Sequence, residues 1–270
     1  MEQRVSISIA DGVADVRLVR ADKMNALDAA MFEALVAATE RLTHEKGVRA
    51  VVLSGEGRAF CAGLDMGRFA AMKDGGNGVA GGEKRDLSAR THGQANFPQQ
   101  AVWGWRRLPV PVIAAIQGVA FGGGFQLALG ADMRFLTPDA RMSIMEIKWG
   151  LVPDMAGTPI LASLVRDDIL RELTYTGRIF SAQEAMSYGL ATRICDDPHA
   201  AAMELAREIA GKSPDAIRAC KRMLNKLSVD PGPALLAESV EQQKLLGSPN
   251  QTEAVRANME KRAPRFAEAG

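Results

Sequence analysis

Two apolar stretches of this chain each end in a glycine-bearing bend, and this repeated pattern constrains the fold more than any other feature. The run "VRAVVLSGEG" is rich in β-branched residues and leads into "GEGRAFCAGLDM". The run "PVPVIAAIQGVA" leads into the triplet Gly122, Gly123 and Gly124, where a helix is expected to begin. Such continuous apolar runs are typical of strands that are buried on both faces of a parallel sheet. We therefore expect an α/β fold.

The first fifty residues predict how the sheet starts. The stretch "VSISIADGVADVRLVR" alternates on either side of an "ADG" turn, which indicates a β-hairpin. Residues 25–47 then place Leu27, Met31, Leu35 and Leu42 near helical spacing, as in an amphipathic helix. Together with the apolar run that follows, these segments predict a strand–helix–strand crossover unit.

The remaining segments divide the chain into two regions. After about Asp197 the pattern is helical to the last residue, so we predict a body over residues 1–197 and a helical region over 198–270. Apolar helices outside a main core often mark contacts between subunits. Residues 67–100 are rich in glycine and mixed in charge, and they predict a surface loop that is either a lid or a solvated connection.

Composition and charge argue against several classes of function. The 270 residues carry a formal net charge of +1 and no block of like charges, so nothing indicates binding to nucleic acid or to an anionic membrane. The first residues do not resemble a signal peptide, and no apolar run is long enough to span a membrane. Together with three scattered cysteines that lack a CxxC pair, this predicts a cytoplasmic protein with buried free thiols.

Histidine chemistry is also not expected. The three histidines, His44, His92 and His199, lie outside any glycine-rich or apolar motif, and no HExxH sequence is present. A zinc site and a histidine-based triad therefore have no support in the sequence. If the protein is an enzyme, we expect carboxylates to carry out its acid–base steps.

Both glycine-bearing bends could expose backbone N–H groups with no side chain in the way. The helix predicted after Gly124 adds the positive end of its dipole. Two such N–H groups pointing at one oxygen would form an oxyanion hole, which stabilises negative charge in a transition state. For each bend taken singly, a plain turn is the alternative. A nucleotide site fits less well, because "GEGRAFCAG" lacks both the GxGxxG spacing and the Lys-Ser/Thr end of a phosphate loop.

Two carboxylates stand out in "MSIMEIKWGLVPDMAGT". Glu146 interrupts an apolar run, and Asp154 follows eight positions later, after a "GLVP" turn that could return the chain toward it. Apolar surroundings raise the pKa of a carboxyl group, which suits a general acid or base. Two carboxylates in different environments can divide the two roles between them. The alternative is that Glu146 is only a charge on an edge strand.

At these residues the sequence resembles the crotonase (enoyl-CoA hydratase/isomerase) superfamily over nearly the whole chain. The matching stretches are "NAL" at residues 25–27, "AFCAGLD" at 59–65, "PVIAAIQGVAFGGG" at 111–124, "EIKWGLVPD" at 146–154, "TGRIFSAQEAMSYGLA" at 176–191 and the late "EKR…F" at 260–266. The resemblance implies a spiral of ββα turns with a helical C-terminal trimerisation region, in which trimers commonly pair into hexamers. It also implies an acyl-CoA thioester as the ligand, with no separate cofactor and no metal.

The resemblance assigns roles to individual residues as well. The two oxyanion donors of the family correspond to the N–H groups of Leu64 and Gly123, which would hold the thioester oxygen while an enolate forms. The stretch that lines the coenzyme A site corresponds to Leu64, Asp65, Met66 and Gly67, together with Gly123. On this basis the thioester carbonyl would lie on the glycine triplet.

The acid–base positions match the family only in part. Its hydratases carry two glutamates; the later one is Glu146 here, but Gln126 occupies the earlier position. A glutamine side chain stays neutral and cannot act as a general base, although it can hydrogen-bond a water or the substrate. The spacing of Glu146 and Asp154 instead resembles the dienoyl-CoA isomerases of the superfamily, which have an aspartate at the position of Gln126.

We therefore expect catalytic roles for Glu146, Asp154 and Gln126, with double-bond isomerisation of an enoyl- or dienoyl-CoA as the reaction. Hydration that uses Glu146 alone is the nearest alternative. Asp154 could also act as a nucleophile on the acyl group. A further interpretation, from another class, is a non-catalytic acyl-CoA-binding protein.

The ends of the ligand are less well defined by the sequence. Candidates to contact the acyl tail, each of which fits plain packing equally well, are Phe69, Met72, Phe97, Trp103 and Trp105. Candidates to face the coenzyme A phosphates, for which surface solvation is the alternative, are Arg20, Lys23 and Lys261.

Overall fold

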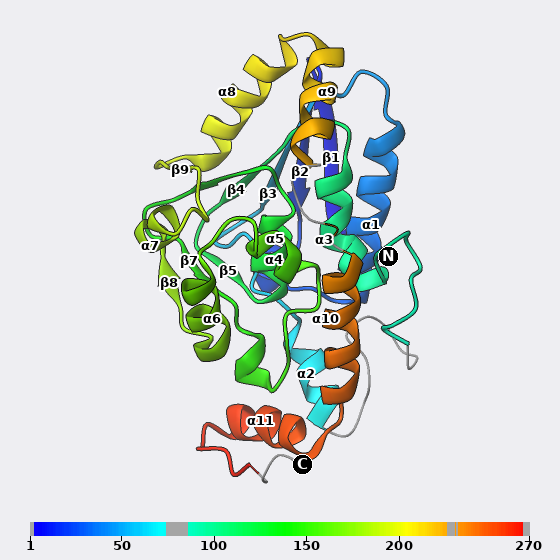
Figure 1. Ribbon diagram of the computed structural model, residues 1–270. Coiled ribbons are helices and arrows are strands. Elements are labelled where there is room, and N and C mark those ends of the chain that lie inside the picture. The colour runs from blue at the N-terminus through cyan, green and yellow to red at the C-terminus, as the bar shows by residue number, and fades with distance from the viewer. Residues whose placement is uncertain (1–2, 74–85, 226–229, 231, 267–270) are drawn as a thin grey trace.

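The computed structural model describes residues 3–73, 86–225, 230 and 232–266 (Figure 1). Its strands are β1 (Val5–Ala10), β2 (Val13–Leu18), β3 (Ala50–Gly55), β4 (Val112–Ile116), β5 (Val119–Phe121), β6 (Met133–Leu136), β7 (Arg141–Ser143), β8 (Phe180–Ser181) and β9 (Arg193–Ile194). Its α-helices are α1 (Ala29–His44), α2 (Met66–Lys73), α3 (Phe97–Arg107), α4 (Gly123–Leu129), α5 (Gly157–Leu161), α6 (Asp167–Thr176), α7 (Ala182–Ser187), α8 (Pro198–Ala210), α9 (Pro214–Asn225), α10 (Gly232–Leu245) and α11 (Pro249–Glu260). Two short 3-10 helices cover Ala21–Lys23 and Glu146–Trp149.

The predicted hairpin and crossover are both confirmed. Strands β1 and β2 pair antiparallel, and the turn between them places Asp11 and Gly12 in the left-handed region, at φ of 51° and 78°. Strands β2 and β3 pair in parallel with α1 between them in the chain. Helix α1 begins at the residue after Asp28, whose side chain accepts a hydrogen bond from Met31 N–H.

Strand β3 is buried on both faces, which explains its unbroken apolar sequence. Val51 and Leu53 belong to the main core on the α1 side of the sheet, whereas Ala50 and Val52 face a second cluster that is completed by α8. Alternate residues of a strand point to opposite faces, so both sets must be apolar when both faces are covered. Figure 1 shows α8 along one side of the sheet and α1 with α3 on the other.

Successive strands enter two different sheets, and this produces the spiral of ββα turns. The larger sheet has the order β1-β2-β3-β4-β6-β9, and the smaller one has the order β5-β7-β8. Strand β4 is followed directly by β5, and β6 by β7, so each turn of the chain contributes to both sheets. The bend after β3 joins the smaller layer through a bridge between Cys61 and Ala120. The glycine triplet therefore lies at the end of the smaller sheet.

The last four helices confirm the predicted helical region, and they pack closely on the body. Helix α8 covers one face of the larger sheet, α10 lies against α5, and α11 lies against α2 and the turn at Glu146–Trp149. A boundary near residue 197 as a domain limit, and an oligomerisation role for residues 198–270, stay predictions. What the structure shows is that α10 and α11 contact the elements that surround the glycine triplet.

The expected loop over residues 67–100 differs from the structure in its first part. Residues Met66–Lys73 form α2, and α3 begins at Phe97 with a reciprocal capping box between Asn96 and Gln99. Residues 74–85 of the predicted loop lie outside the described part of the chain. A similar capping box joins Ser181 and Glu184 at the start of α7. Of the three cysteines expected to be buried, Cys61 is buried, Cys195 is half-buried and Cys220 is exposed.

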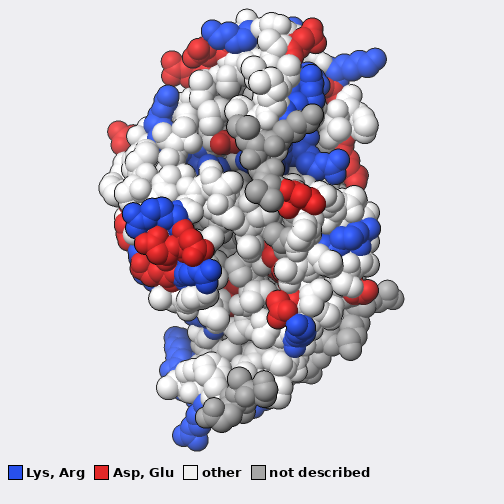
Figure 2. Space-filling model, viewed as in Figure 1, with Lys and Arg blue, Asp and Glu red and all other residues white. Residues whose placement is uncertain are grey.

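Charged side chains on the visible face are mixed in sign. Figure 2 shows basic and acidic residues interspersed, with one dense cluster over α6 and α7. That cluster includes the ion pairs Arg171–Asp167, Arg178–Glu172 and Arg178–Glu184, each at 2.7 Å. This face thus carries no broad area of one sign that would indicate a nucleic-acid surface. No helix in the described ranges is long and apolar enough to cross a membrane.

Candidate active site

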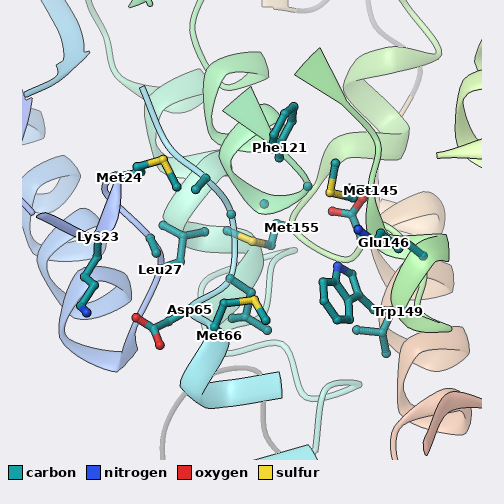
Figure 3. Close-up of a pocket in the computed structure, with 18 of the residues that line it drawn as sticks. Lys23, Met24, Leu27, Asp65, Met66, Phe121, Met145, Glu146, Trp149 and Met155 are labelled. Carbon is teal, nitrogen blue, oxygen red and sulfur yellow. The ribbon is translucent and has the colours of Figure 1, made fainter. Parts of the chain in front are cut away.

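A cavity of about 730 Å³ opens where the bend after β3, the glycine triplet and residues 145–155 meet (Figure 3). It brings together all but one of the residues predicted to act in catalysis, in the oxyanion hole or in the stretch that lines the coenzyme A site. Those that line it are Leu64, Asp65, Met66, Gly67, Gly123, Glu146 and Asp154. Gln126 is buried behind this lining rather than within it.

Leu64 and Gly123 both line this cavity, and their backbone N–H groups have no acceptor in the described part of the chain. Leu27 pairs with the bend as in a parallel sheet: its N–H donates to Gly63 C=O at 2.8 Å, and its C=O accepts from Asp65 N–H at 3.1 Å. Because N–H directions alternate along an extended chain, the N–H of Leu64 points away from Leu27. Gly123 is the first residue of α4, where N–H groups have no intrahelical acceptor. Neither N–H has an acceptor among the described residues.

The two bends are locked together by contacts that leave no room for side chains. A Cβ at Gly124 would lie 2.3 Å from the carbonyl oxygen of Cys61, and a Cβ at Gly63 would lie 2.5 Å from that of Phe121. Gly63 also has φ of 88°, which a residue with a side chain rarely adopts. Phe121 N–H donates to Cys61 C=O at 3.1 Å. Glycine is therefore required because one main chain packs directly on the other.

Glu146 presents one unpaired carboxylate oxygen at the cavity. Its Oε1 accepts a hydrogen bond of 2.7 Å from Gln126 Nε2, while its Oε2 is buried and has no partner among the described residues. Burial raises the pKa of Glu146 to about 7, against the opposing effect of the hydrogen bond from Gln126. A carboxyl group with this pKa exchanges protons readily near neutral pH. Figure 3 shows it between Met145 and Trp149.

Asp154 is the second buried carboxylate of the cavity. Its Oδ2 has no hydrogen-bond partner in the described part of the chain. Burial, and then the negative charges of Glu146 and Glu238, raise the pKa of Asp154 well above its ordinary value. The turn after Glu146 therefore does return the chain, as the sequence predicted, and the two carboxylates influence each other.

Gln126 is held by the backbone of the segment that follows Asp154. Its Oε1 accepts from Met155 N–H and from Gly157 N–H, both at 2.9 Å, which leaves Nε2 to face Glu146. The side chain is 1% exposed. Its contacts in the structure are thus with the protein, and its predicted contact with a water or the substrate stays a prediction.

Charged side chains lie at the other end of the cavity. Arg20 Nη1 contacts Asp65 Oδ2 at 2.6 Å, and Asp65 Oδ1 accepts from Gly67 N–H at 2.8 Å. Burial would raise the pKa of Asp65, but these hydrogen bonds outweigh it and lower the pKa. Lys23 also lines the cavity, and Figure 3 shows it near Asp65, whereas Lys261 does not line it. Two of the three basic candidates are therefore placed at the cavity.

Most of the apolar lining comes from residues other than those predicted from the sequence. Trp105 is fully buried in the core, and Phe97 and Trp103 pack on the core rather than lining the cavity. The side chains of Phe69 and Met72 lie outside the described part of the structure. Besides Leu64 and Met66, the large apolar residues that line the cavity are Met24, Leu27, Phe121, Met145, Trp149, Leu151, Met155 and Ile179. Their positions on separate turns of the spiral give no local signal in the sequence.

Comparison with known proteins agrees with this geometry. A sequence model described as enoyl-CoA hydratase/isomerase matches residues 8–269. This chain belongs to the enoyl-CoA hydratase/isomerase family. It is thus an acyl-CoA enzyme of that family, with the crotonase fold.

The relatives that are similar to this chain are named for different reactions. It is 33% identical to a carnitinyl-CoA dehydratase from Proteus mirabilis, over 98% of this chain and 99% of that protein. It is 34% identical to a mitochondrial delta(3,5)-delta(2,4)-dienoyl-CoA isomerase from Mus musculus, over 77% of this chain and 64% of that protein. A crystal structure of an enoyl-CoA hydratase/isomerase from Pseudoalteromonas atlantica superposes with a TM-score of 0.83 at 28% identity, covering 98% of this chain and 100% of that one.

Two side chains from α10 lie at or directly behind the cavity, and neither was predicted from the sequence. Gln242 lines the cavity, and its Oε1 accepts from Val152 N–H at 3.1 Å. Glu238, one helical turn earlier, is buried and accepts from Ala156 N–H at 2.9 Å and Thr158 N–H at 2.7 Å. Both lie in a region whose sequence indicated only an amphipathic helix. Within the described ranges, no three His, Cys, Asp or Glu side chains are grouped so as to hold a metal ion.

Proposed function

We propose that this enzyme shifts a double bond along the acyl chain of an enoyl- or dienoyl-CoA. The thioester oxygen would accept hydrogen bonds from the N–H groups of Leu64 and Gly123, and Glu146 and Asp154 would move the protons. The observation that carries the proposal is that one cavity is lined by Leu64 and Gly123 and by two buried carboxylates. Both backbone N–H groups, and one oxygen of each carboxylate, lack a partner among the described residues. Isomerisation needs these parts and no activated water.

The electrostatic environment supports different roles for the two acids. The pKa of Glu146 is about 7, so at neutral pH much of it is ionised and can accept a proton. The pKa of Asp154 is raised well above its ordinary value, first by burial and then by neighbouring negative charge, which favours the protonated form. Glu146 is therefore the candidate base, and Asp154 is the candidate acid.

The proposed step conserves protons and electrons. Glu146 removes a proton from the carbon next to the thioester carbonyl, and the electron pair moves onto the oxygen held by Leu64 and Gly123. The enolate then takes a proton from Asp154 at the far end of the conjugated system, and the electron pair returns to leave a double bond beside the carbonyl. Return of one proton from Glu146 to Asp154 restores the starting state. Two N–H donors stabilise the enolate most where its charge is greatest.

Hydration or dehydration is the second candidate, and a specific comparison favours it. The similarity to the carnitinyl-CoA dehydratase extends over almost the full length of both proteins, whereas the similarity to the dienoyl-CoA isomerase covers less of each. In that reaction Glu146 would accept a proton from the water molecule that adds to a 2-enoyl-CoA. Asp154 would not be needed, because no proton has to reach a distant carbon.

The two candidates can be separated with one substitution. We would incubate the purified protein with 2-enoyl-, 3-enoyl- and 3,5-dienoyl-CoA, and follow absorbance and products. Asp154→Asn should lower isomerisation by about 100-fold or more, the scale of one acid–base contribution. A hydration driven by Glu146 should largely survive it. Asp167→Asn, an exposed aspartate on α6, is the matched control.

Other outcomes would point to the remaining interpretations. Absence of turnover for all three substrates, with acyl-CoA binding intact, would contradict the proposal and favour a binding protein. A covalent ester on Asp154 found by mass spectrometry would favour a nucleophilic route. The proposal includes a cytoplasmic homotrimer or hexamer without a further cofactor, and light scattering of the purified protein tests its assembly.

A further inference from the structure

The segment after Asp154 is held by an alternating pattern of hydrogen bonds. Met155 N–H and Gly157 N–H donate to Gln126 Oε1, each at 2.9 Å. Ala156 N–H and Thr158 N–H donate to the two carboxylate oxygens of Glu238, at 2.9 and 2.7 Å. Four consecutive N–H groups are therefore shared between two side chains that approach from opposite sides of the segment.

The two side chains belong to elements that are far apart in the chain. Gln126 is on α4, two residues after the glycine triplet, and Glu238 is on α10, 80 positions after Thr158. Ala156 has φ of 69°, so this segment follows a path that a residue with a side chain rarely adopts without support. Bonds on both sides of Ala156 supply that support.

Glu238 is itself fixed from a third helix. Gln99 on α3 donates from Nε2 to Glu238 Oε2 at 3.2 Å, and to Leu235 C=O at 2.7 Å. Gln99 is in turn locked by its reciprocal bonds with Asn96. The carboxylate of Glu238 thus has three donors and is buried, so its orientation has little freedom.

The same helix also holds the chain on the other side of Asp154. Gln242 Oε1 accepts a hydrogen bond of 3.1 Å from Val152 N–H, two residues before Asp154. The backbone on both sides of Asp154 is therefore bonded to α10, at Val152 by Gln242 and at residues 156 and 158 by Glu238. A shift of α10 by one ångström would move Asp154 relative to Glu146, whose place is set by Gln126 and the 3-10 turn.

We propose that Glu238 is a positioning residue for the acid–base pair, which sets the place of Asp154 through the backbone of residues 155–158. The inference rests on the proposed function, because it gives Glu238 a role in that proton transfer. Glu238 does not line the cavity and has no contact with the substrate in this role. The alternative is that Glu238 only stabilises the packing of α10 on α5.

The test compares three variants of the full-length protein. Glu238→Gln keeps the size of the side chain but has one acceptor oxygen in place of two, so one of the two amides is left unpaired. Glu238→Asp keeps the charge but is one methylene too short to reach both amides. Glu241→Gln, on the exposed side of the same helix, is the matched control.

Two readouts are needed, one for the backbone and one for catalysis. Hydrogen–deuterium exchange of the peptide over residues 151–161 should rise about tenfold or more in Glu238→Gln and Glu238→Asp, since a bonded amide is released. Isomerase kcat should fall about tenfold or more while KM stays within about threefold. Displacement of a catalytic group slows the chemical step but leaves the binding of substrate nearly unchanged. Glu241→Gln should match the wild type in both.

The outcomes distinguish this inference from the proposed function. If the wild type turns over none of the enoyl-CoA substrates, the proposed function fails first. If the wild type is active and either folded Glu238 variant keeps a kcat within about twofold of it, the inference is wrong, whatever the exchange shows. A variant that loses kcat with no increase in exchange at residues 155–158 would also overturn it. If Glu238→Gln does not fold, Glu238→Asp alone decides.

Discussion

Gln126 donates a hydrogen bond of 2.7 Å to Glu146, and the direction of this bond is imposed by the backbone. Two N–H groups, of Met155 and Gly157, occupy the amide oxygen of Gln126, so only its nitrogen can face the carboxylate. A glutamate at the same position could accept both backbone bonds but would have no proton to give while ionised. The glutamine thus provides Glu146 with a donor that an ionised acid there would lack.

This relationship predicts the effect of Gln126→Glu on the pH dependence of catalysis. In the wild type, kcat/KM should rise with pH through about 7 as Glu146 loses its proton and becomes a base. A second carboxylate beside it replaces a favourable donor with negative charge, so the pKa of Glu146 should increase. The rising limb should move upward by about one pH unit or more. Measurement of kcat/KM between pH 5 and 9 checks this.

A matched control for that substitution is Gln243→Glu. Gln243 also accepts a backbone bond, from Leu87 N–H, and it lies away from the cavity. Its pH profile should coincide with that of the wild type. A Gln126→Glu profile that coincides as well would show that Glu146 is not the titrating base.

Removal of the buried charge at Glu146 should stabilise the protein at high pH. The folded-state pKa of about 7 lies above the ordinary value of 4.5, so the folded protein binds the extra proton between these values. Wild-type stability should therefore fall as pH rises from about 4.5 to above 7, by about 3 kcal/mol from this group. Glu146→Gln has no such loss, so its free energy of unfolding relative to the wild type should increase from pH 5 to pH 8.

Urea denaturation of both proteins at several pH values measures this difference. Glu241→Gln, an exposed change, should follow the wild-type curve. Parallel curves for Glu146→Gln and the wild type would mean that Glu146 is not titrating in this range. The same variant should lose about 100-fold or more in kcat, since it lacks the base.

Gly124→Ala should damage stability and catalysis together. The added Cβ would lie 2.3 Å from the carbonyl oxygen of Cys61, so the two bends must separate. Overpacking of this kind costs about 1–3 kcal/mol. Separation also misaligns the N–H groups of Leu64 and Gly123, so kcat should fall about tenfold or more.

The control for this change is Gly211→Ala at the end of α8, where the nearest atom to an added Cβ is 3.4 Å away. It should leave kcat unchanged. A Gly124→Ala enzyme with wild-type kcat, measured at a temperature where it is folded, would argue against the assigned pair of donors.

Lys23→Ala should weaken the binding of the whole coenzyme A thioester. Lys23 lines the cavity near Asp65, whereas the guanidinium of Arg20 is already paired with Asp65. The lysine is therefore the better candidate to face a phosphate. KM for an acyl-CoA should rise about threefold to tenfold at low salt, and less at high salt, because salt screens exposed charges. KM for an acyl-pantetheine, which lacks the nucleotide, should not change; an equal rise for both would contradict the assignment.

Local patterns predicted much of the fold and the central part of the site. The alternation before and after the "ADG" turn gave the hairpin, and the apolar runs gave β3 and β4, because the signals for these elements lie within a few residues. Both bends and both acids were also located, since small residues and an acid within an apolar run are visible in the sequence. The structure brings Leu64, Gly123, Glu146 and Asp154 into one cavity.

The features that were not predicted from the sequence depend on contacts between residues that are far apart in the chain. Glu238 looks like any charged residue of an amphipathic helix, and its burial depends on α10 packing against α5. The requirement for Gly124 comes from Cys61, which belongs to another turn of the spiral. Likewise, Trp105 was a candidate for the acyl tail because it is aromatic and lies in the segment that follows the first bend. Its side chain is buried in the core, and nothing in the local sequence indicates this.

The location of α10 has a consequence for the order in which this enzyme becomes competent during synthesis. Both bends and both acids leave the ribosome well before Glu238, which follows Thr158 by 80 positions. A nascent chain that lacks α10 therefore has neither Glu238 nor Gln242 to hold the segment around Asp154. Proton transfer would then begin only after α10 has docked, so activity depends on a helix that is synthesised after both bends and both acids.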